Sequence, residues 1–301
     1  MAKIPVGATI AHAYRFAFTN IPALSRAIWL PLLAHLTLSF FLIKRMTRFL
    51  AAVQARDPSA LSQLGPLIPW AVVALILFFV QLTAAMETAL GRPPASPFYF
   101  PIGRKMWRLM GAFLTAALAI AALGVVGLLC LFAGGLILNA LIKSAPGAPA
   151  AAAILTGLLA AGFCCSILFF AARFLFLLAP VNLSEDELGV TRAWHLSAGN
   201  FWRIVLVILA IATPVIVINY AFQFALSGFP PSSFGLSKGA AQTARTAWQM
   251  KQANALSDFW YLSLPVSALL TFLQLGVGSG AQAFAYRSLT DEDRSAPVAG
   301  H

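Results

Sequence analysis

ARFLFLLAPVNLSEDELGVTRAWHLSAGNFWRIVL, residues 172–206, joins two long apolar segments through a short charged and aromatic one. A single arginine, Arg173, lies in the apolar part, an acidic cluster follows at 185–187, and basic and aromatic residues then continue to Arg203. The flanking apolar segments are each long enough to cross a bilayer. This order indicates a connection at a membrane surface between two transmembrane helices.

The composition of the whole chain agrees with that interpretation. Of its 301 residues 60% are hydrophobic and 10% charged, and the mean hydropathy is +0.84, whereas ordinary soluble domains are about 25% charged. Six stretches without charge are near or above the length of a transmembrane helix: 27–43, 66–86, 109–142, 144–172, 204–237 and 259–286. The sequence therefore predicts an all-α polytopic membrane protein with six transmembrane helices arranged as three hairpins.

The charge balance is basic, with 20 Lys and Arg against 9 Asp and Glu. These basic residues flank the apolar stretches, where anionic lipid headgroups lie, so the expected partners are membrane lipids, anionic phospholipid above all, and not nucleic acid. With six helices and a cytoplasmic N-terminus, 12 Lys and Arg fall on the cytoplasmic side and 8 outside. This bias favours cytoplasmic termini, although four basic residues in the first external loop oppose it. The N-terminus lacks the apolar core of a removable signal peptide.

An internal repeat places similar residues before each hairpin. IAHAYRFAFTNI at 10–21, GRKMWRLMGAF at 103–113 and VTRAWHLSAGNF at 190–201 align without gaps over a basic, an aromatic and a second basic position. The aligned residues are His12, Lys105 and Arg192; Tyr14, Trp107 and Trp194; and Arg15, Arg108 and His195. Apolar spacing predicts that a short amphipathic interfacial helix precedes each hairpin. We call these nine residues the collar; they are candidates for binding anionic lipid or another ligand, and ordinary interfacial anchoring by aromatic and basic residues is the alternative.

Each hairpin also ends on a charged residue, which is Glu87, Arg173 or Arg287. The repeats then span about 8–91, 101–182 and 188–290, within one transmembrane domain at 1–290 that is followed by a flexible polar tail at 291–301. If one helix ran from Arg173 to Asn182, Arg173 would lie ~13 Å deeper in the membrane. A charge at that depth needs a partner. We therefore predict an intramembrane pair of Glu87 with Arg173, with Arg287 nearby; the alternative is an arginine that reaches the headgroups alone.

Several local patterns predict smaller features. Ser184 and Glu187 form a capping-box pattern, which predicts a helix that begins there and explains the acidic cluster. Gly276 and Gly280 predict a close helix–helix contact. Pro214, like Pro265, predicts a kink and a backbone carbonyl that needs another partner. The longest polar loop, 228–258, has room for one short helix at most.

No pattern in the chain matches a catalytic, metal or cofactor site, so we expect no cofactor, no metal and no catalytic residue. The cysteines at 130, 164 and 165 lack a CxxC spacing and are expected to pack as small apolar residues. The four histidines are scattered, and Glu87 is the only carboxylate beside a transmembrane segment. Polar residues within the apolar segments are expected to form hydrogen bonds between helices, or otherwise to line a polar path: His35, Gln81, Asn139, Asn219, Gln223, Gln274 and Gln282.

The connection quoted above resembles a known bacterial family. Arg173, Pro180, Glu185, Ser197 and the run Asn200 to Trp202 resemble the membrane domain attached to some glycerophosphodiester phosphodiesterases and the related YciC-like inner-membrane proteins. The resemblance implies a multi-pass protein of the bacterial inner membrane. The phosphodiesterase domain itself, with its carboxylates and histidines, has no counterpart in this sequence.

Three functions remain open on the sequence alone. The first is a non-enzymatic membrane protein that binds phospholipid or another anionic amphiphile at the cytoplasmic interface, in lipid handling or in support of partner proteins. The second is a small-solute transporter or channel, and the third a membrane-embedded enzyme. A water-filled cavity lined by amides would favour transport, whereas a basic and aromatic groove open to lipid would favour the first.

Overall fold

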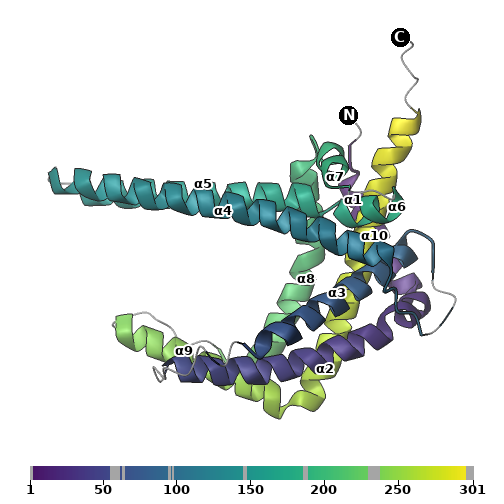
Figure 1. Cartoon of the computed structure of the whole chain (residues 1–301), viewed down its shortest axis with the longest axis horizontal. Helices are drawn as coiled ribbons and strands as arrows, with labels where there is room; N and C mark the ends of the chain where they lie inside the picture. The colour runs from purple at the N-terminus through teal and green to yellow at the C-terminus, as the bar shows by residue number, and fades with distance from the viewer. Residues whose placement is uncertain are drawn as a thin grey trace, which may run out of the picture. The chain divides into compact units, whose positions relative to one another are not determined.

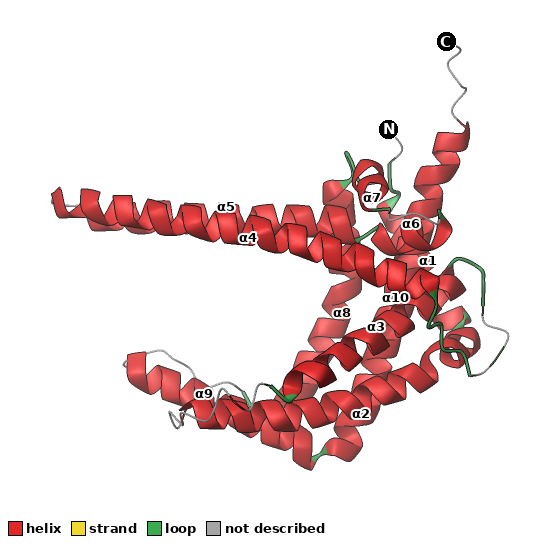
Figure 2. Ribbon diagram, in the orientation of Figure 1, coloured by secondary structure: helices red, strands yellow, loops and turns green. Residues whose placement is uncertain are grey.

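The computed structural model describes residues 3–54, 62, 65–93, 96, 98–144, 148–185, 189–229 and 238–295. Within these residues all regular secondary structure is helical (Figures 1 and 2). The helices are α1 (Val6–Thr19), α2 (Ile21–Gln54), α3 (Leu67–Ala89), α4 (Arg104–Ser144), α5 (Ala148–Leu175), α6 (Leu178–Ser184), α7 (Val190–Leu196), α8 (Phe201–Ser227), α9 (Lys238–Asp258) and α10 (Trp260–Ser295).

Six segments of the described chain are long and apolar enough to cross a membrane, which confirms the predicted class. They are Ile21–Met46, Leu67–Ala89, Arg104–Leu136, Ile154–Ser184, Phe201–Ser227 and Trp260–Thr290. Because they are helical apart from the turn at 176–177, most of their backbone polar groups are satisfied within the helices, as lipid requires. The protein is an all-α multi-pass membrane protein.

The short helix expected before each hairpin is a separate element at two of the three places. Both α1 and α7 end in a turn before the following long helix, and the turn after α7 contains Gly199 with a φ of 73°. The segment at 103–113 is instead the beginning of α4, which continues without interruption to Ser144. No proline and no glycine with positive φ interrupts the backbone there, so the helix continues into the transmembrane segment.

Two features of the polar segments differ from the sequence-based predictions. Helix α10 continues to Ser295, so residues 291–295 of the expected flexible tail are helical; extending an existing helix avoids the cost of nucleation. The rest of that tail, 296–301, lies outside the described residues. In the long polar loop, α9 has 21 residues and so is longer than the short helix expected there.

The chain forms two compact units, each built from separate segments. The first unit comprises Met1–Val6, Gly103–Leu206 and Phe284–His301, and the second comprises Gly7–Ile102 and Val207–Ala283. The third sequence repeat, 188–290, contributes to both units. The unit boundaries therefore do not coincide with the repeat boundaries.

In the second unit, α2 and α3 pack as an antiparallel hairpin (Figure 1), and α10 packs against α1 and the start of α2. A Cβ atom on Gly280 would lie 2.8 Å from Cδ1 of Phe16. At Gly276 it would lie 3.1 Å from Cδ1 of Leu24 and 3.3 Å from Cβ of Ala17. The predicted close contact at these two glycines is confirmed.

The carbonyl freed by Pro214 also has its partner in the second unit. A helix normally pairs each carbonyl with the N–H four residues later, but Pro214 has no N–H to offer to Ala210. The hydroxyl of Tyr14 donates to the Ala210 carbonyl oxygen instead, at 3.0 Å. The side chain of this collar residue therefore joins α1 to α8.

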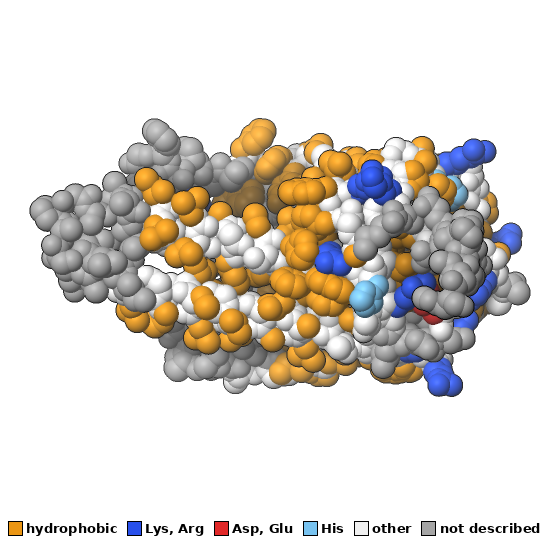
Figure 3. Space-filling model, turned by 90° about the horizontal axis from the view of Figure 1, so that it is seen from above, with side chains coloured by type: hydrophobic (Ala, Val, Ile, Leu, Met, Phe, Trp, Pro, Cys, Tyr) orange, Lys and Arg blue, Asp and Glu red, His pale blue; other side chains and the backbone are white. Residues whose placement is uncertain are grey.

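In the first unit, α4 and α5 form a long antiparallel hairpin (Figure 1). A Cβ atom on Gly127 of α4 would lie 2.0 Å from the Phe163 ring of α5, so the glycine leaves room for that ring. Hydrophobic side chains cover the described length of the hairpin (Figure 3). The three cysteines are exposed on it, which contradicts the packing role expected for them; along this hairpin, apolar side chains face outward, as lipid permits.

Some of the polar residues within the apolar segments make the expected hydrogen bonds. Gln81 Nε2 lies 2.9 Å from His35 Nδ1 and donates to the Pro31 carbonyl at 3.2 Å, which joins α3 to α2. On α8, Gln223 accepts a hydrogen bond from Gln252 of α9. Gln274 is exposed, and the side chain of Asn139 lies outside the described part of the structure.

Candidate functional site

The connection from α5 to α8 contains two short helices in the first unit. Helix α5 ends at Leu175, only two residues after Arg173. The buried helix α6 follows, then α7, and the turn through Gly199 leads into α8. Arg173 therefore lies in the last turn of α5, and the single helix expected up to Asn182 is divided into α5 and α6. Because the transmembrane segment Ile154–Ser184 continues through α6, the depth of Arg173 in the membrane stays a prediction.

The helix predicted to begin at Ser184 is also corrected. Ser184 is the last residue of α6, and α7 begins six residues later without a side-chain cap. Glu185 instead lies 3.6 Å from Arg192 Nε and accepts a hydrogen bond from the Tyr286 hydroxyl at 2.9 Å. Its carboxylate thus joins α7 to α10, and the other acidic residues of the cluster lie outside the described residues.

Arg173 is held against α7 by three contacts. Its guanidinium carbon lies 3.5 Å from the centre of the Trp194 ring, which is a cation–π contact. Its Nη2 donates to the Trp194 carbonyl at 2.8 Å, and its Nε donates to Ser197 Oγ at 3.3 Å. Ser197 Oγ itself donates to the same carbonyl at 2.9 Å. Arg173 thus has specific partners at the end of its helix, although none of these is an acid.

Aromatic side chains pack around that tryptophan. The rings of Phe170 and Phe174 stack on Trp194 with centres 5.7 and 4.8 Å away, and Phe169 meets it edge-on at 6.2 Å. Phe169 also packs on Phe201 of α8 at 4.9 Å. Because rings in such a cluster restrict one another, the indole is a fixed support for the guanidinium.

A second arginine approaches from the start of α8. Arg203 Nη1 donates to the Ile4 carbonyl at 2.9 Å, and the Ile4 N–H donates to Asn200 Oδ1 at 3.0 Å. The buried Ile4 is thus held between two residues of the α8 start. Nε and Nη2 of Arg203 donate to no protein group within the described part of the chain.

Both arginines line one open hollow in the first unit, with a volume of about 530 Å³. We call it the Arg173–Arg203 hollow, and its lining is Phe169, Arg173, Gly199, Phe201, Trp202 and Arg203. Trp202 is 73% exposed. Among the described residues, the lining contains two guanidinium groups and no carboxylate. The hollow therefore suits an anion that is attached to an apolar group.

The first unit contains six of the nine collar residues, in unlike surroundings. Trp194 supports Arg173, Arg192 pairs with Glu185, and Arg108 Nη2 donates to the Asn182 carbonyl at 2.5 Å. The remaining three differ in exposure, because Trp107 and His195 are exposed and Lys105 is half-buried. Of these residues, Trp194 contacts the lining of the hollow, through Arg173 and Phe169.

The other three collar residues belong to the second unit. Arg15 is exposed, His12 is half-buried, and the Tyr14 hydroxyl is bonded to the α8 backbone. The role of these three residues in lipid binding stays a prediction.

Glu87, the acid predicted to pair with Arg173, also belongs to the second unit. It is buried near the end of α3 and accepts a hydrogen bond from the Tyr99 hydroxyl. Burial, that hydrogen bond and the negative charge of Glu87 together raise the pKa of Tyr99. Arg287, in the first unit, is exposed. The pairing of Glu87 with Arg173 stays a prediction.

The sequence had pointed to Arg173 but not to Arg203, Phe169 or Gly199. The sequence did contain a signal for Arg203. Near the end of the segment 172–206, an asparagine, two aromatic residues and an arginine directly precede an apolar run. Only folding shows that this arginine and Arg173, 30 residues apart, line the same hollow. Among the described residues no group of three or more His, Cys, Asp or Glu could hold a metal ion.

No known protein family matches the chain, and neither does any curated protein or any solved structure.

Proposed function

We propose that the protein is a non-enzymatic membrane protein that binds an anionic amphiphile, in the first instance a phospholipid, in the Arg173–Arg203 hollow. One observation carries the proposal: two arginines and three aromatic residues line an open hollow, and no carboxylate lines it within the described part of the chain. Charge-assisted hydrogen bonds from guanidinium to phosphate are strong and suited to its geometry. A role in lipid handling, or in support of partner proteins, would follow.

The position of the hollow along the chain supports an amphiphile over a soluble anion. Arg203 is the third residue of α8, so it lies at the end of a long apolar helix, and Arg173 in the last turn of α5 lines the same hollow. At such ends the headgroups of the bilayer meet its hydrocarbon. The aromatic side chains offer surface to the apolar part of the ligand, and each basic residue contributes ~1 kcal/mol of attraction to an anionic lipid surface.

The proposed location is the bacterial inner membrane, with both termini and the hollow on the cytoplasmic side. The resemblance of the 173–202 segment to YciC-like proteins supports the membrane, and the excess of Lys and Arg on that side supports the orientation.

The test is native mass spectrometry, with lipid identification, of the gently purified protein and of variants that remove one charge each. Arg203→Gln and the double variant with Arg173→Gln should lose co-purified anionic lipid. Arg104→Gln is the matched control, because it removes the same charge from an exposed side chain of the first unit that belongs neither to the hollow nor to the collar.

Trp202→Ala is a further variant, which we expect to fold normally because the Trp202 side chain is mostly exposed. It should weaken lipid retention while the melting temperature stays unchanged. If Arg203→Gln and Trp202→Ala both retain anionic lipid at the wild-type level, the hollow is not the binding site.

The wider collar is tested by neutralising Arg15, Arg108 and Arg192 together. Reduced anionic lipid in this triple variant, with a normal melting temperature, would extend the binding surface to the collar. Unchanged lipid content would leave the collar residues with anchoring and packing roles only.

A second candidate function, small-solute transport, is favoured by the interior of the second unit. Four buried side-chain oxygens there have no hydrogen-bond partner among the described residues: Gln81 Oε1, Thr83 Oγ1, Ser279 Oγ and Gln282 Oε1. Unsatisfied oxygens within apolar helices suit water or a polar solute. Uptake assays in proteoliposomes, with Gln81→Leu as the test variant, separate this candidate from lipid binding.

A further inference from the structure

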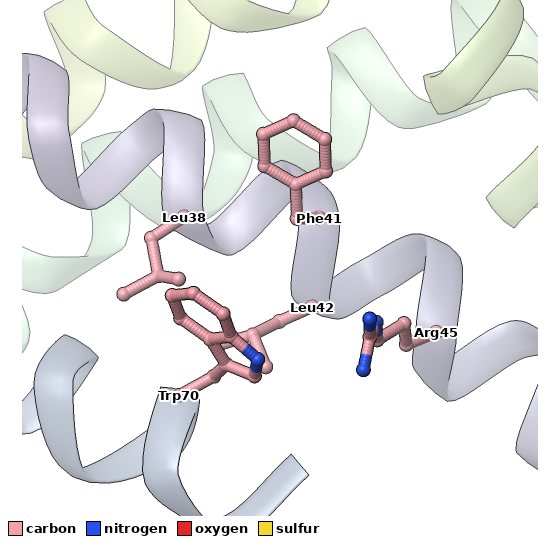
Figure 4. A pocket seen from close by; sticks show the side chains of 5 residues that line it. All are labelled: Leu38, Phe41, Leu42, Arg45 and Trp70. Atoms are coloured by element: carbon pink, nitrogen blue, oxygen red, sulfur yellow. The ribbon is translucent and has the colours of Figure 1, made fainter. Parts of the chain in front are cut away.

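A second hollow lies in the second unit, between α2 and α3 (Figure 4). Its volume is about 240 Å³, and its lining is Leu38, Phe41, Leu42, Arg45 and Trp70. The four residues from α2 follow the spacing i, i+3, i+4 and i+7, so they form one stripe along that helix. Trp70, from the first turn of α3, faces this stripe.

The charged group lies at one end of the stripe. Arg45 is the residue before the end of the first transmembrane segment, Ile21–Met46, and Trp70 is the fourth residue of the next, Leu67–Ala89. Both therefore lie at the depth of the lipid headgroups on the same side of the membrane. Leu38 lies seven residues before Arg45, which is ~10 Å deeper in the hydrocarbon at the helical rise.

Two hydrogen-bond donors share the headgroup end of the hollow. In Figure 4 the Trp70 indole nitrogen is on the side of the ring that faces the Arg45 guanidinium. Neither group makes a hydrogen bond or ion pair with any described residue. The positive charge and the indole N–H are therefore both available to an acceptor at that end.

The shape and polarity of this hollow select its occupant. One water occupies ~30 Å³ of liquid and needs at least two polar partners, whereas the wall beyond Arg45 is apolar. An acyl chain fits such a wall, and a phosphate at its end would meet the guanidinium and the indole. A soluble anion would leave the apolar wall uncovered.

We propose that the Arg45–Trp70 hollow binds one anionic phospholipid, whose phosphate accepts hydrogen bonds from Arg45 and Trp70 while an acyl chain lies along Leu42 and Leu38. Because α2 crosses the membrane once, this lipid belongs to the leaflet opposite the N-terminal end of α2. The proposal does not rest on the function proposed for the Arg173–Arg203 hollow.

The neighbouring residue supplies a matched control. Lys44 carries the same charge at the same depth, but it lies on another face of α2, with its Nζ 4.6 Å from the centre of the Phe40 ring. Arg45→Gln and Lys44→Gln therefore remove equal charge from the same membrane surface, and only the first changes the hollow.

The experiment is native mass spectrometry of the full-length protein titrated with phosphatidylglycerol or, separately, with phosphatidylcholine. The wild-type protein and Lys44→Gln should bind one phosphatidylglycerol with the same affinity. Arg45→Gln should bind it roughly tenfold more weakly. Leu42→Trp keeps the charge but fills the hollow, and it should lose the same lipid. Variants at Arg173 and Arg203 should leave this lipid in place, so that failure of one site is distinguishable from failure of the other.

Four results would overturn the proposal. Equal loss in Lys44→Gln would show that interfacial charge alone holds the lipid, and equal binding of phosphatidylcholine would show a groove without headgroup recognition. Displacement by soluble glycerol phosphate would show a phosphate site that does not need the acyl chain. Unchanged binding in both Arg45→Gln and Leu42→Trp, with normal melting temperatures, would show that the hollow holds no specific lipid.

Discussion

The Tyr14 hydroxyl donates a hydrogen bond to the Ala210 carbonyl, 3.0 Å away, and this is the carbonyl that Pro214 leaves without a helical partner. A residue of α1 thus satisfies a backbone group of α8 that would otherwise face an apolar surrounding. Such unsatisfied groups are costly within a membrane.

Substitution of Tyr14 by Phe should therefore destabilise the protein, by about 0.5–1.5 kcal/mol for one hydrogen bond. The loss should be smaller when Pro214 is first replaced by Ala, because residue 214 then offers its own N–H to Ala210. Thermal unfolding of the four proteins of this double-mutant cycle measures the coupling. Equal losses in both backgrounds would show that the hydroxyl does not act through this carbonyl.

The glycines of α10 give a second prediction. Gly280→Ala should destabilise the protein by roughly 1–3 kcal/mol, because its Cβ would lie 2.8 Å from the Phe16 ring. Gly278→Ala is the matched control on the same helix, since a Cβ there meets nothing within 4 Å. Melting temperatures in one detergent compare the two, and a control variant as unstable as Gly280→Ala would contradict the close contact.

Tyr99 predicts a pH dependence of stability. Its pKa is raised above the ordinary value of 10.0 in the folded protein, mainly by burial and then by its hydrogen bond to the Glu87 carboxylate. A raised pKa favours the protonated phenol in the folded state, so this contribution is complete below pH 10 and is lost as the pH rises from 10 toward the raised value.

The measurement is the melting temperature from pH 8 to pH 11 of the wild type and of Tyr99→Phe. The wild type should lose more stability above pH 10 than the variant, because the two proteins differ only in the phenol group of Tyr99. Parallel curves would show that Tyr99 has the same pKa in the folded and unfolded states.

The predicted pair of Glu87 and Arg173 is tested by a cycle of Glu87→Ala and Arg173→Ala. If the two side chains pair, the single Arg173 variant should be less stable than the double variant, because it leaves a buried carboxylate without its partner. Additive losses would show that Tyr99 and Trp194, the partners that these two charges have within their own units, are sufficient.

The proposed topology is tested with reporter fusions. Six transmembrane helices place both termini on one side, so a reporter at residue 301 and one in the loop 228–258 should report opposite compartments. Identical signals from the two positions would contradict a single crossing by α10 between them.

The sequence alone determined the class, the number of transmembrane helices and the close contact at Gly276 and Gly280. These features follow from hydropathy and residue size along a single helix, which are local properties. Pro214 likewise indicated a backbone carbonyl that needs another hydrogen-bond partner. In the same way, Arg173 indicated a charge that needs specific contacts.

Only the tertiary structure decided which partners meet these needs. The donor for Ala210 comes from Tyr14, 196 residues away, and Arg173 is supported by the indole ring and the carbonyl of Trp194. The same holds for the two hollows, whose walls combine residues of different helices. Sequence spacing determines which residues share one face of a helix. Which residues of another helix lie against that face depends on how the helices pack, and the packing energy comes from contacts between residues distant in the chain.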